Sequence, residues 1–399
     1  MRVSTLQIYN QSLASMQSQQ ARVQSTELQI SSGLRIMKPS DDPSGAVKVI
    51  NLSANINAIE QYSRNVSAAE ASLGFEESVI SSVNTNLQRI RELVIQGNNS
   101  TNPDYAKASI ALEINERLDE LVSLANTRNA AGEYIFAGFK VDSPPFTESN
   151  GVIAYQGDAG ERQVQISEAS KITVRDSGKA VFQDILSGNG SIEVLASASN
   201  TGNAVIGQFG STGGFIPDNY TVTFSQLNPS DPVTYAVTDG TGGTIATGTY
   251  QEGSINFAGA QFVLSGTPAD NDTITLNPSK NRDLFTTIND IAEALSRPAP
   301  EDKDRARFHN DMAEGLVNLD QALDNMNRIR AGIGARLNHV ETLDSINQDL
   351  KLQLETVLSD TQDLDYAEAI SRFNLQLNSL QAAQQAFVKA TSLSLFQYI

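Results

Sequence analysis

Residue types that commonly carry chemistry are scarce in this chain of 399 residues. It has no cysteine, which excludes disulfides, thiolate nucleophiles and sulfur-ligated metals. Its two histidines, His309 and His339, lie far apart on one predicted helix, so they cannot share a site. We can propose no serine, histidine and aspartate set around them. The sequence therefore predicts no catalytic, cofactor or metal site.

Three short motifs have residue types that could hold an ion or a phosphate. Asp41 and Asp42 could form a subunit contact or a metal site, but a calcium site needs more converging oxygens, and the pair suits helix capping. Gly332-Ile-Gly334 lies inside a helical pattern, so it lacks the context of a phosphate-binding loop and favours close packing. The run from Thr238 to Gly243 is typical of a hairpin turn.

The strongest pattern lies at the two ends of the chain, where apolar residues recur every three or four positions. They are Leu6, Tyr9, Leu13, Met16, Val23 and Ile30 at the start, and Ile370, Phe373, Leu377, Leu380 and Phe387 at the finish. Residues three and four apart share a helix face, so each end predicts a helix with one narrow apolar stripe. Such helices are marginal alone in water and need partners.

Polar residues interrupt these stripes, namely Gln20, Glu27, Gln384 and Thr391. The spacing alone does not separate the core of an ordinary soluble bundle from a contact between subunits. Polar side chains at such positions would cost stability in a monomer's core, whereas in an assembly they can set the register. The interruptions therefore favour assembly.

Further helical patterns flank the middle of the chain. One runs from about residue 46 to 97, and the next, from 105 to about 127, should fold back on it as an antiparallel hairpin. Helical spacing returns at 284–295 and at 302–360. Pro39 and Pro43 should stop the first helix, with Ser40 or Asp41 capping the next.

The apolar period changes to two between about residues 132 and 278, where turn residues multiply. Clear examples are 220–224, 233–237, 261–264 and 273–276. Short β-branched runs at this spacing predict strands of a small sandwich or barrel. The expected fold class is multidomain: an elongated helical bundle or coiled coil made by the N- and C-terminal regions, with an inserted all-β domain.

We expect five segments. They are an N-terminal assembly helix at 1–40 and a C-terminal one at 361–399, both disordered in the free monomer, a helical body at 41–139 and 281–360, and the β insert at 140–280.

The chain carries a formal net charge of −18 and a pI near 4.5, which argue against nucleic acid and anionic membranes as partners. It has no apolar run of membrane-spanning length and no pattern of a cleaved secretory signal.

Three motifs resemble those of the flagellin superfamily. They comprise Gly33, Leu34, Arg35, Asp41, Asp42 and Gly45 near the start, Gly334 and Arg336 in the last long helix, and Tyr134, Phe136 and Gly138 in the run Tyr-Ile-Phe-Ala-Gly. The third is similar to the signature of the hook-filament junction branch. Glu133 stands where that branch would have a basic residue, which puts a charge contact there in doubt.

The resemblance implies a structural subunit of the bacterial flagellum, not an enzyme. It implies export through the flagellar type III apparatus without a cleaved signal peptide, a ring of copies that joins hook to filament, and contacts with a neighbouring hook-associated protein and flagellin. It also implies an export chaperone at the C-terminal region. Alternatives are a filament-forming flagellin and a surface adhesin acting through the β insert.

The residues expected to carry self-assembly are Leu6, Leu13, Met16, Val23, Ile370, Phe373, Leu377, Leu380 and Phe387. A second group, Tyr134, Phe136, Phe139 and Phe146, lies where helix gives way to sheet. We expect these aromatic side chains to join the helical and β parts instead of forming a ligand site.

Overall fold

The computed structural model describes residues 5–149, 151–228 and 230–392. They belong to two compact units, a first made of Met1–Asn65 and Thr342–Ile399, and a second made of Val66–Glu341. Within the described ranges no helix is long and apolar enough to cross a membrane.

The helices follow the predicted pattern closely. They are α1 (Thr5–Ser32), α2 (Pro43–Gly97), α3 (Asp104–Ala125), α4 (Gly178–Phe182), α5 (Leu284–Ser296), α6 (Asp302–Gln362) and α7 (Tyr366–Ser392). The expected helices of the body are confirmed to within three residues at each end. The structure adds the short α4, which begins at the Ser177 cap.

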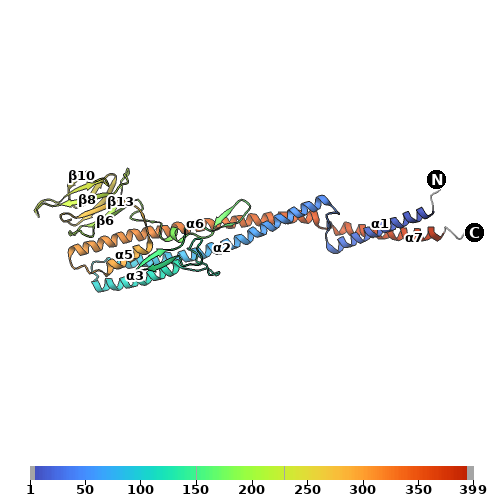
Figure 1. Cartoon of the computed structure of the whole chain (residues 1–399), viewed down its shortest axis with the longest axis horizontal. Coiled ribbons are helices and arrows are strands. Elements are labelled where there is room, and N and C mark those ends of the chain that lie inside the picture. The colour runs from blue at the N-terminus through green and yellow to red at the C-terminus, as the bar shows by residue number, and fades with distance from the viewer. Residues whose placement is uncertain (1–4, 150, 229, 393–399) are drawn as a thin grey trace, which may run out of the picture. The chain divides into compact units, whose positions relative to one another are not determined.

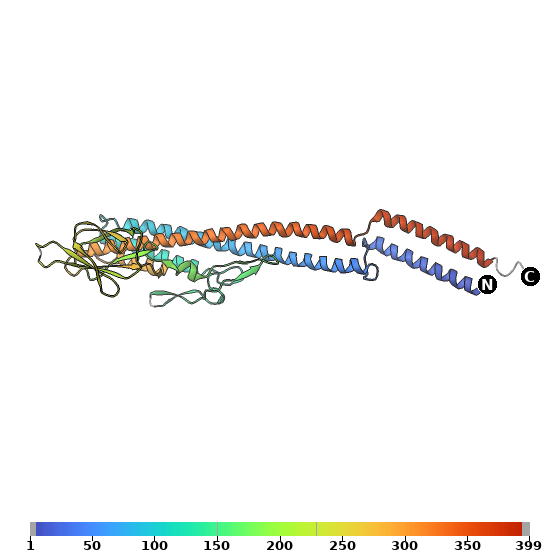
Figure 2. The same cartoon turned by 90° about the horizontal axis from the view of Figure 1, so that it is seen from above.

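The two longest helices, α2 and α6, run antiparallel in each unit. In the second unit Arg91 binds Asp320 at 2.6 Å and Arg330 binds Glu77 at 2.7 Å. In the first unit Lys351 binds Glu60 at 2.9 Å. Figure 2 shows the two helices side by side. As predicted, α3 folds back along α2, where Arg89 binds Glu113 at 2.8 Å.

The strands lie between α3 and α5 in the sequence. They are β1 (Phe146–Ser149), β2 (Val152–Tyr155), β3 (Gln163–Gln165), β4 (Lys171–Thr173), β5 (Ile185–Leu186), β6 (Ile192–Ala196), β7 (Val205–Ser211), β8 (Tyr220–Ser225), β9 (Thr234–Thr238), β10 (Thr244–Thr249), β11 (Gly253–Phe257), β12 (Ala260–Ser265), β13 (Thr273–Pro278) and β14 (Asn281–Arg282). The predicted strands correspond to β8, β9, β12 and β13.

Two antiparallel sheets form a small sandwich. One has the strand order β10-β9-β8-β13-β6 and the other β11-β12-β7. Along β8 and β12 every second side chain is buried, because alternate residues point to the same sheet face. The buried side chains of both sheets, including Phe224, Phe262 and Leu276, form one shared core. The fold class is therefore confirmed, and the part of the insert from β6 to β13 is a sandwich (Figure 1), whereas β1-β2, β3-β4 and β5-β14 are separate two-stranded sheets.

Asparagine side chains on α6 fasten the inserted segments to the helices of the second unit. Asn310 accepts a hydrogen bond from the Ile206 amide at 2.8 Å, and Asn318 accepts one from the Gly188 amide at 2.8 Å. Asn325 donates to the Val181 carbonyl at 2.8 Å. These contacts satisfy backbone groups that would otherwise be buried without partners.

Candidate assembly interface

The first unit contains an antiparallel pair of terminal helices, α1 and α7, which lie side by side in both views (Figures 1 and 2). Thr26 donates a hydrogen bond to Gln376 at 2.8 Å, and Arg372 donates one to Gln29 at 3.3 Å. The rings of Tyr9 and Phe387 lie 5.2 Å apart. These contacts fix the register of the two helices.

The seam between α1 and α7 has the alternating spacing of four and three residues that is typical of a coiled coil. Its side chains are Ser12, Met16, Gln19, Val23, Thr26 and Ile30 from α1, and Ala369, Phe373, Gln376, Leu380, Ala383 and Phe387 from α7. In heptad terms Val23 and Leu380 are a positions, whereas Thr26 and Gln376 are d positions. Large apolar side chains fill the a positions of both helices, but small or polar ones fill most d positions, so the seam is thin.

The structure separates the predicted assembly residues into two groups. Met16, Val23, Phe373, Leu380 and Phe387 lie in the seam. Leu13, Ile370 and Leu377 lie at e positions beside it, where Leu13 and Ile370 are exposed. The side chain of Leu6 lies outside the described residues.

The prediction that Gln20, Glu27 and Gln384 interrupt the apolar stripes is wrong for the seam between α1 and α7. Gln20, Glu27 and Gln384 are exposed at e positions next to it, and Thr391 lies outside the described side chains. Instead, polar side chains enter the seam at d positions, where Thr26 is 4% exposed and bonds to Gln376. Sequence reasoning missed these d residues because it followed the larger apolar side chains at a and e. The available signal was that Thr26 and Gln19 continue the a/d spacing from Val23.

A groove of about 360 Å³ lies on one side of the pair. It is lined by Gln11, Ser12, Ser15, Met16, Ala383, Ala386 and Phe387. Four of these seven lining residues are serine or alanine, and Met16 and Phe387 are each partly buried.

The first flagellin-like motif forms a connection where both chain ends leave their long helices. Gly33 has φ +73°, a conformation that favours glycine, and ends α1. Its carbonyl accepts a hydrogen bond from the Leu364 amide at 2.9 Å, and the Arg35 amide donates to the Gln362 carbonyl at 2.7 Å. Leu34 pairs with Asp363 as an isolated β-bridge. The breaks before α2 and after α6 are therefore joined by backbone hydrogen bonds.

Asp41 and Asp42 have separate structural roles in this connection. Asp42 accepts hydrogen bonds from the Gly45 amide at 2.9 Å and the Ser44 hydroxyl at 3.0 Å, and these bonds lower the pKa of its carboxyl. Asp41 accepts from the Lys38 amide at 2.9 Å. The predicted cap at Ser40 or Asp41 is thus wrong: Asp42 caps α2, whose first residue is Pro43. A side chain at Gly45 would collide with Asp42 and Ile36.

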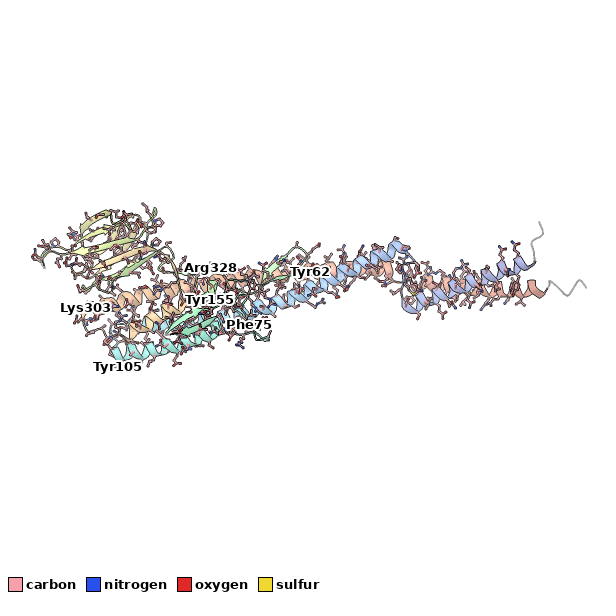
Figure 3. The ribbon with its side chains drawn as sticks, in the orientation of Figure 1. Tyr62, Phe75, Tyr105, Tyr155, Lys303 and Arg328 are labelled. Carbon is pink, nitrogen blue, oxygen red and sulfur yellow. The ribbon has the colours of Figure 1, made fainter. Side chains whose placement is uncertain are left out.

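The junction signature packs the β segments against the helices of the second unit. Phe136 and Phe146 are buried and contact Phe182 at ring distances of 5.3 Å, and Phe285 of α5 completes the cluster. Tyr155, labelled in Figure 3, lies 5.1 Å from Phe146.

The remaining aromatic residues of the group lie outside this cluster. Tyr134 is buried under the Arg128 guanidinium, 4.3 Å from the ring centre. Phe139 is 66% exposed, so the prediction that it joins the cluster is wrong. Gly138 turns the chain away at φ +69°, against Asp158.

Charged residues of the family motifs hold the segment after β4 against α6 and against the segment after α3. Arg336 binds the Asp176 carboxylate at 2.5 Å and donates to the Thr173 carbonyl at 3.2 Å. Glu133 binds Arg175 at 2.7 Å, so a charge contact exists at this position with the acidic residue. Apart from the neighbouring residues and backbone of its own helix, no described atom lies within 4 Å of a Cβ placed at Gly334, so the expected close packing at this glycine is absent within the described chain.

Metal and histidine chemistry receive no support from the described ranges. They contain no group of three or more histidine, cysteine or carboxylate residues placed to hold a metal. His309 is half-buried and lies 2.8 Å from the Asn98 side chain oxygen. Burial, followed by the nearby Lys107 charge, lowers its pKa.

Comparison with known proteins identifies the family. Residues 3–140 match the bacterial flagellin N-terminal helical region, and residues 316–399 match the C-terminal helical region. The flagellar hook-associated protein 3 of Escherichia coli is 28% identical over 401 residues, covering 100% of this chain and 99% of the relative.

Two crystal structures share both fold and sequence with the chain. FlgL of Xanthomonas campestris is 30% identical with a TM-score of 0.72, and the match covers 77% of this chain and 99% of that one. Flagellar hook associated protein-3 of Legionella pneumophila is 30% identical with a TM-score of 0.74, covering 78% and 98%. The chain therefore belongs to the flagellar hook-associated protein 3 (FlgL) family and is a structural protein of the bacterial flagellum.

Proposed function

We propose that this chain is the subunit of a ring at the junction between flagellar hook and filament, and that α1 and α7 hold neighbouring subunits together. Its partners are then copies of itself, a neighbouring hook-associated protein and flagellin. The role requires binding and no catalysis. The match over the whole length of a hook-associated protein 3 supports this role over that of a filament-forming flagellin.

The observation that carries the proposal is the exposure of apolar side chains beside a thin seam. Beside the seam, Leu13 is 38% exposed and Ile370 48%, and Tyr9, which packs on Phe387 at the end of the seam, is 47% exposed. Fully burying an exposed side chain of this size contributes about 1.5–3 kcal/mol, and less than half of each surface remains to be covered here, so a neighbouring subunit adds roughly 1 kcal/mol for each side chain that it covers.

We further propose that both terminal helices are disordered in the free chain and become ordered when neighbours cover them. A segment that folds on binding meets its ordering cost at that step. An unfolded end also suits export through the flagellar type III apparatus without a cleaved signal peptide, with a chaperone covering the C-terminal region until export.

The test replaces Leu13 and Ile370 together by aspartate in a strain lacking its own hook-associated protein 3. We expect normal secretion of the double variant but no stable junction, so that cells lose motility and release flagellin into the medium. The matched control is Leu227→Asp. Leu227 is 93% exposed in the loop after β8, so this substitution makes the same chemical change outside the terminal pair.

The control should restore motility. A double variant that restores motility as well as the unmodified chain would show that these side chains do not carry assembly. Indefinite polymerisation of the purified chain into filaments would instead support a flagellin role.

A further inference from the structure

One guanidinium group joins the β sandwich to the helices of the second unit. Arg282 lies on β14, by which the chain returns from the sandwich to α5. Its guanidinium binds Asp290 of α5 at 2.7 Å and Glu314 of α6 at 2.9 Å, and it lies 3.8 Å from Glu193 of β6. Its Nε also donates to the Thr287 hydroxyl at 3.2 Å. Of its three acidic partners, Glu193 belongs to the sandwich.

The neck, residues 187–191 and 279–282 where the chain enters and leaves the sandwich, is loosely packed on α6. Figure 1 shows β6 as the sandwich strand next to α6. Cavities of about 50 and 60 Å³ lie between them. The Ser279 hydroxyl and the Asn318 side-chain nitrogen are buried without a hydrogen-bond partner among the described residues. Because such groups would gain hydrogen bonds in water, packing alone holds the neck weakly.

Carboxylates outnumber guanidinium groups around Arg282. A cavity of about 260 Å³ lies beside it, between α5 and α6. The charged groups that face this cluster are Glu193 from β6, Arg282 from β14, Asp290, Glu293 and Arg297 at α5, and Arg307, Asp311 and Glu314 from α6. Five carboxylates and three guanidinium groups carry a net charge of −2 when all are ionised. Since Asp311 binds Arg297 at 3.0 Å, Arg282 is left to neutralise the excess of carboxylates.

Docking of the sandwich brings Glu193 to a site that is already negative. Arg282 is shared by Asp290 and Glu314 before Glu193 arrives. Glu193 is 8% exposed, so water screens its charge poorly, and its distance from the guanidinium is longer than those of the other two carboxylates. A proton bound by the cluster removes part of this repulsion, so docking and proton binding favour each other.

The ionisation of the cluster agrees with this coupling. Burial raises the pKa of Asp290 above its ordinary value of 3.8 and that of Glu314 above 4.5, although Arg282 opposes both changes. The Glu193 charge adds to the rise at Glu314. The docked state therefore holds protons that an open, hydrated cluster has lost above these ordinary values. Its advantage is present at low pH and is lost as the pH rises through the raised pKa values.

We propose that Arg282 with Glu193, Asp290 and Glu314 forms a latch that fixes the sandwich on α6 in mildly acidic solution and releases it as the pH rises. The hinge is the β5–β14 pair, in which Leu186 pairs with Asn281 and keeps the two connections together. This inference concerns the second unit and does not depend on the proposed role at the junction.

The distance between two spin labels measures whether the sandwich is docked. Thr247 on β10 and Asn115 on α3 are exposed, and the chain has no cysteine of its own, so Thr247→Cys with Asn115→Cys can be labelled in the full chain. Double electron–electron resonance gives the distance distribution at pH 5 and pH 8.5. We expect a narrow distribution at pH 5 and one about twofold wider at pH 8.5, because release lets the sandwich adopt several positions.

Three substitutions in the labelled chain separate the latch from other effects of pH. Glu193→Gln keeps the size of the side chain and removes its charge, so the distribution should stay narrow at both pH values. Arg282→Gln removes the shared partner and should be broad already at pH 5. The matched control Glu252→Gln makes the same change in the exposed loop between β10 and β11, so it should respond to pH as the unsubstituted labelled chain does.

Two results would overturn the latch. One is a distribution of the labelled chain that is equally narrow at pH 5 and pH 8.5, and the other is a Glu193→Gln variant that widens with pH as much as the Glu252→Gln control. Far-UV circular dichroism is recorded on each sample, and widening that accompanies loss of the strand signal is unfolding, which also contradicts release of a folded sandwich. None of these results changes the junction role, which the motility test addresses separately.

Discussion

A buried glutamate in α2 gives the sharpest test of the second unit. Glu76 is 1% exposed. One carboxyl oxygen accepts a hydrogen bond from the Asp176 amide at 2.8 Å, and the other has no partner among the described residues. Burial, then the Asp176 carboxylate, raises the pKa of Glu76 to about 8 from 4.5, although Arg336 and Arg175 oppose the change. The folded chain therefore holds this carboxyl protonated at pH 7.

The consequence for stability follows from proton linkage. Between pH 4.5 and 8 the folded state holds a proton that the unfolded state has lost, so stability falls as the pH rises through this range. Glu76→Gln keeps the shape and the hydrogen-bond acceptor without this cost. At about 1.4 kcal/mol per pKa unit, the variant should be more stable than the parent by about 1 kcal/mol at pH 5, about 3 at pH 7 and about 5 at pH 9.

Urea unfolding followed by circular dichroism at these three pH values measures the difference. The method suits a chain without tryptophan. The control is Glu77→Gln on the next residue, which removes a partly exposed ion pair with Arg330 and should change stability by less than about 1 kcal/mol. A difference between Glu76→Gln and the parent that stays constant from pH 5 to 9, or a variant less stable than the parent at pH 7, refutes the reasoning.

Two further predictions concern the signature turn and the chain ends. Gly138→Ala should destabilise the second unit by about 2–3 kcal/mol, since it forces alanine into φ +69° against Asp158, whereas Gly132→Ala, at φ +81° with open space around it, should cost only about 1 kcal/mol in the same urea assay. Limited proteolysis of the free chain should remove about forty residues from each end and leave a resistant middle; protection of both tails from amide exchange would contradict the expected disorder.

The helices and the main strands could be predicted because their burial follows local periodicity. In β8 each second residue from Tyr220 to Phe224 is buried, and this alternation is visible in the sequence. The connection motif was also recognisable, since Gly33 and Pro43 are strong local signals. The sequence did not show which of the neighbouring polar residues caps α2. Asp42 is selected by its bonds to Gly45 and Ser44, and Ser40 and Asp41 have equally suitable side chains.

The buried charges could not be predicted because distant segments create their surroundings. Glu76 lies in a helix next to Phe75, which is 39% exposed, so its neighbours give no sign of burial. The amide of Asp176, a hundred residues later, and Arg336 on α6 enclose it. The exposure of Phe139 likewise depends on a segment distant in the sequence, because the chain turns at Gly138, where it packs closely on Asp158.

The terminal pair shows why a and e positions both appeared in the sequence pattern. Its intramolecular seam supplies roughly one large apolar side chain per heptad on each helix, as with Met16, Val23 and Ile30. Burying one such side chain contributes about 1.5–3 kcal/mol, and most of a helix's stability in water comes from packing of this kind, so a seam this thin leaves the pair marginal. Covering the e residues Leu13, Leu377 and Ile370 would add a second apolar contribution per heptad on much of the pair. Apolar a and e positions combined with weak d positions are therefore what the proposed assembly requires, because the exposed e side chains are those that a neighbouring subunit would cover.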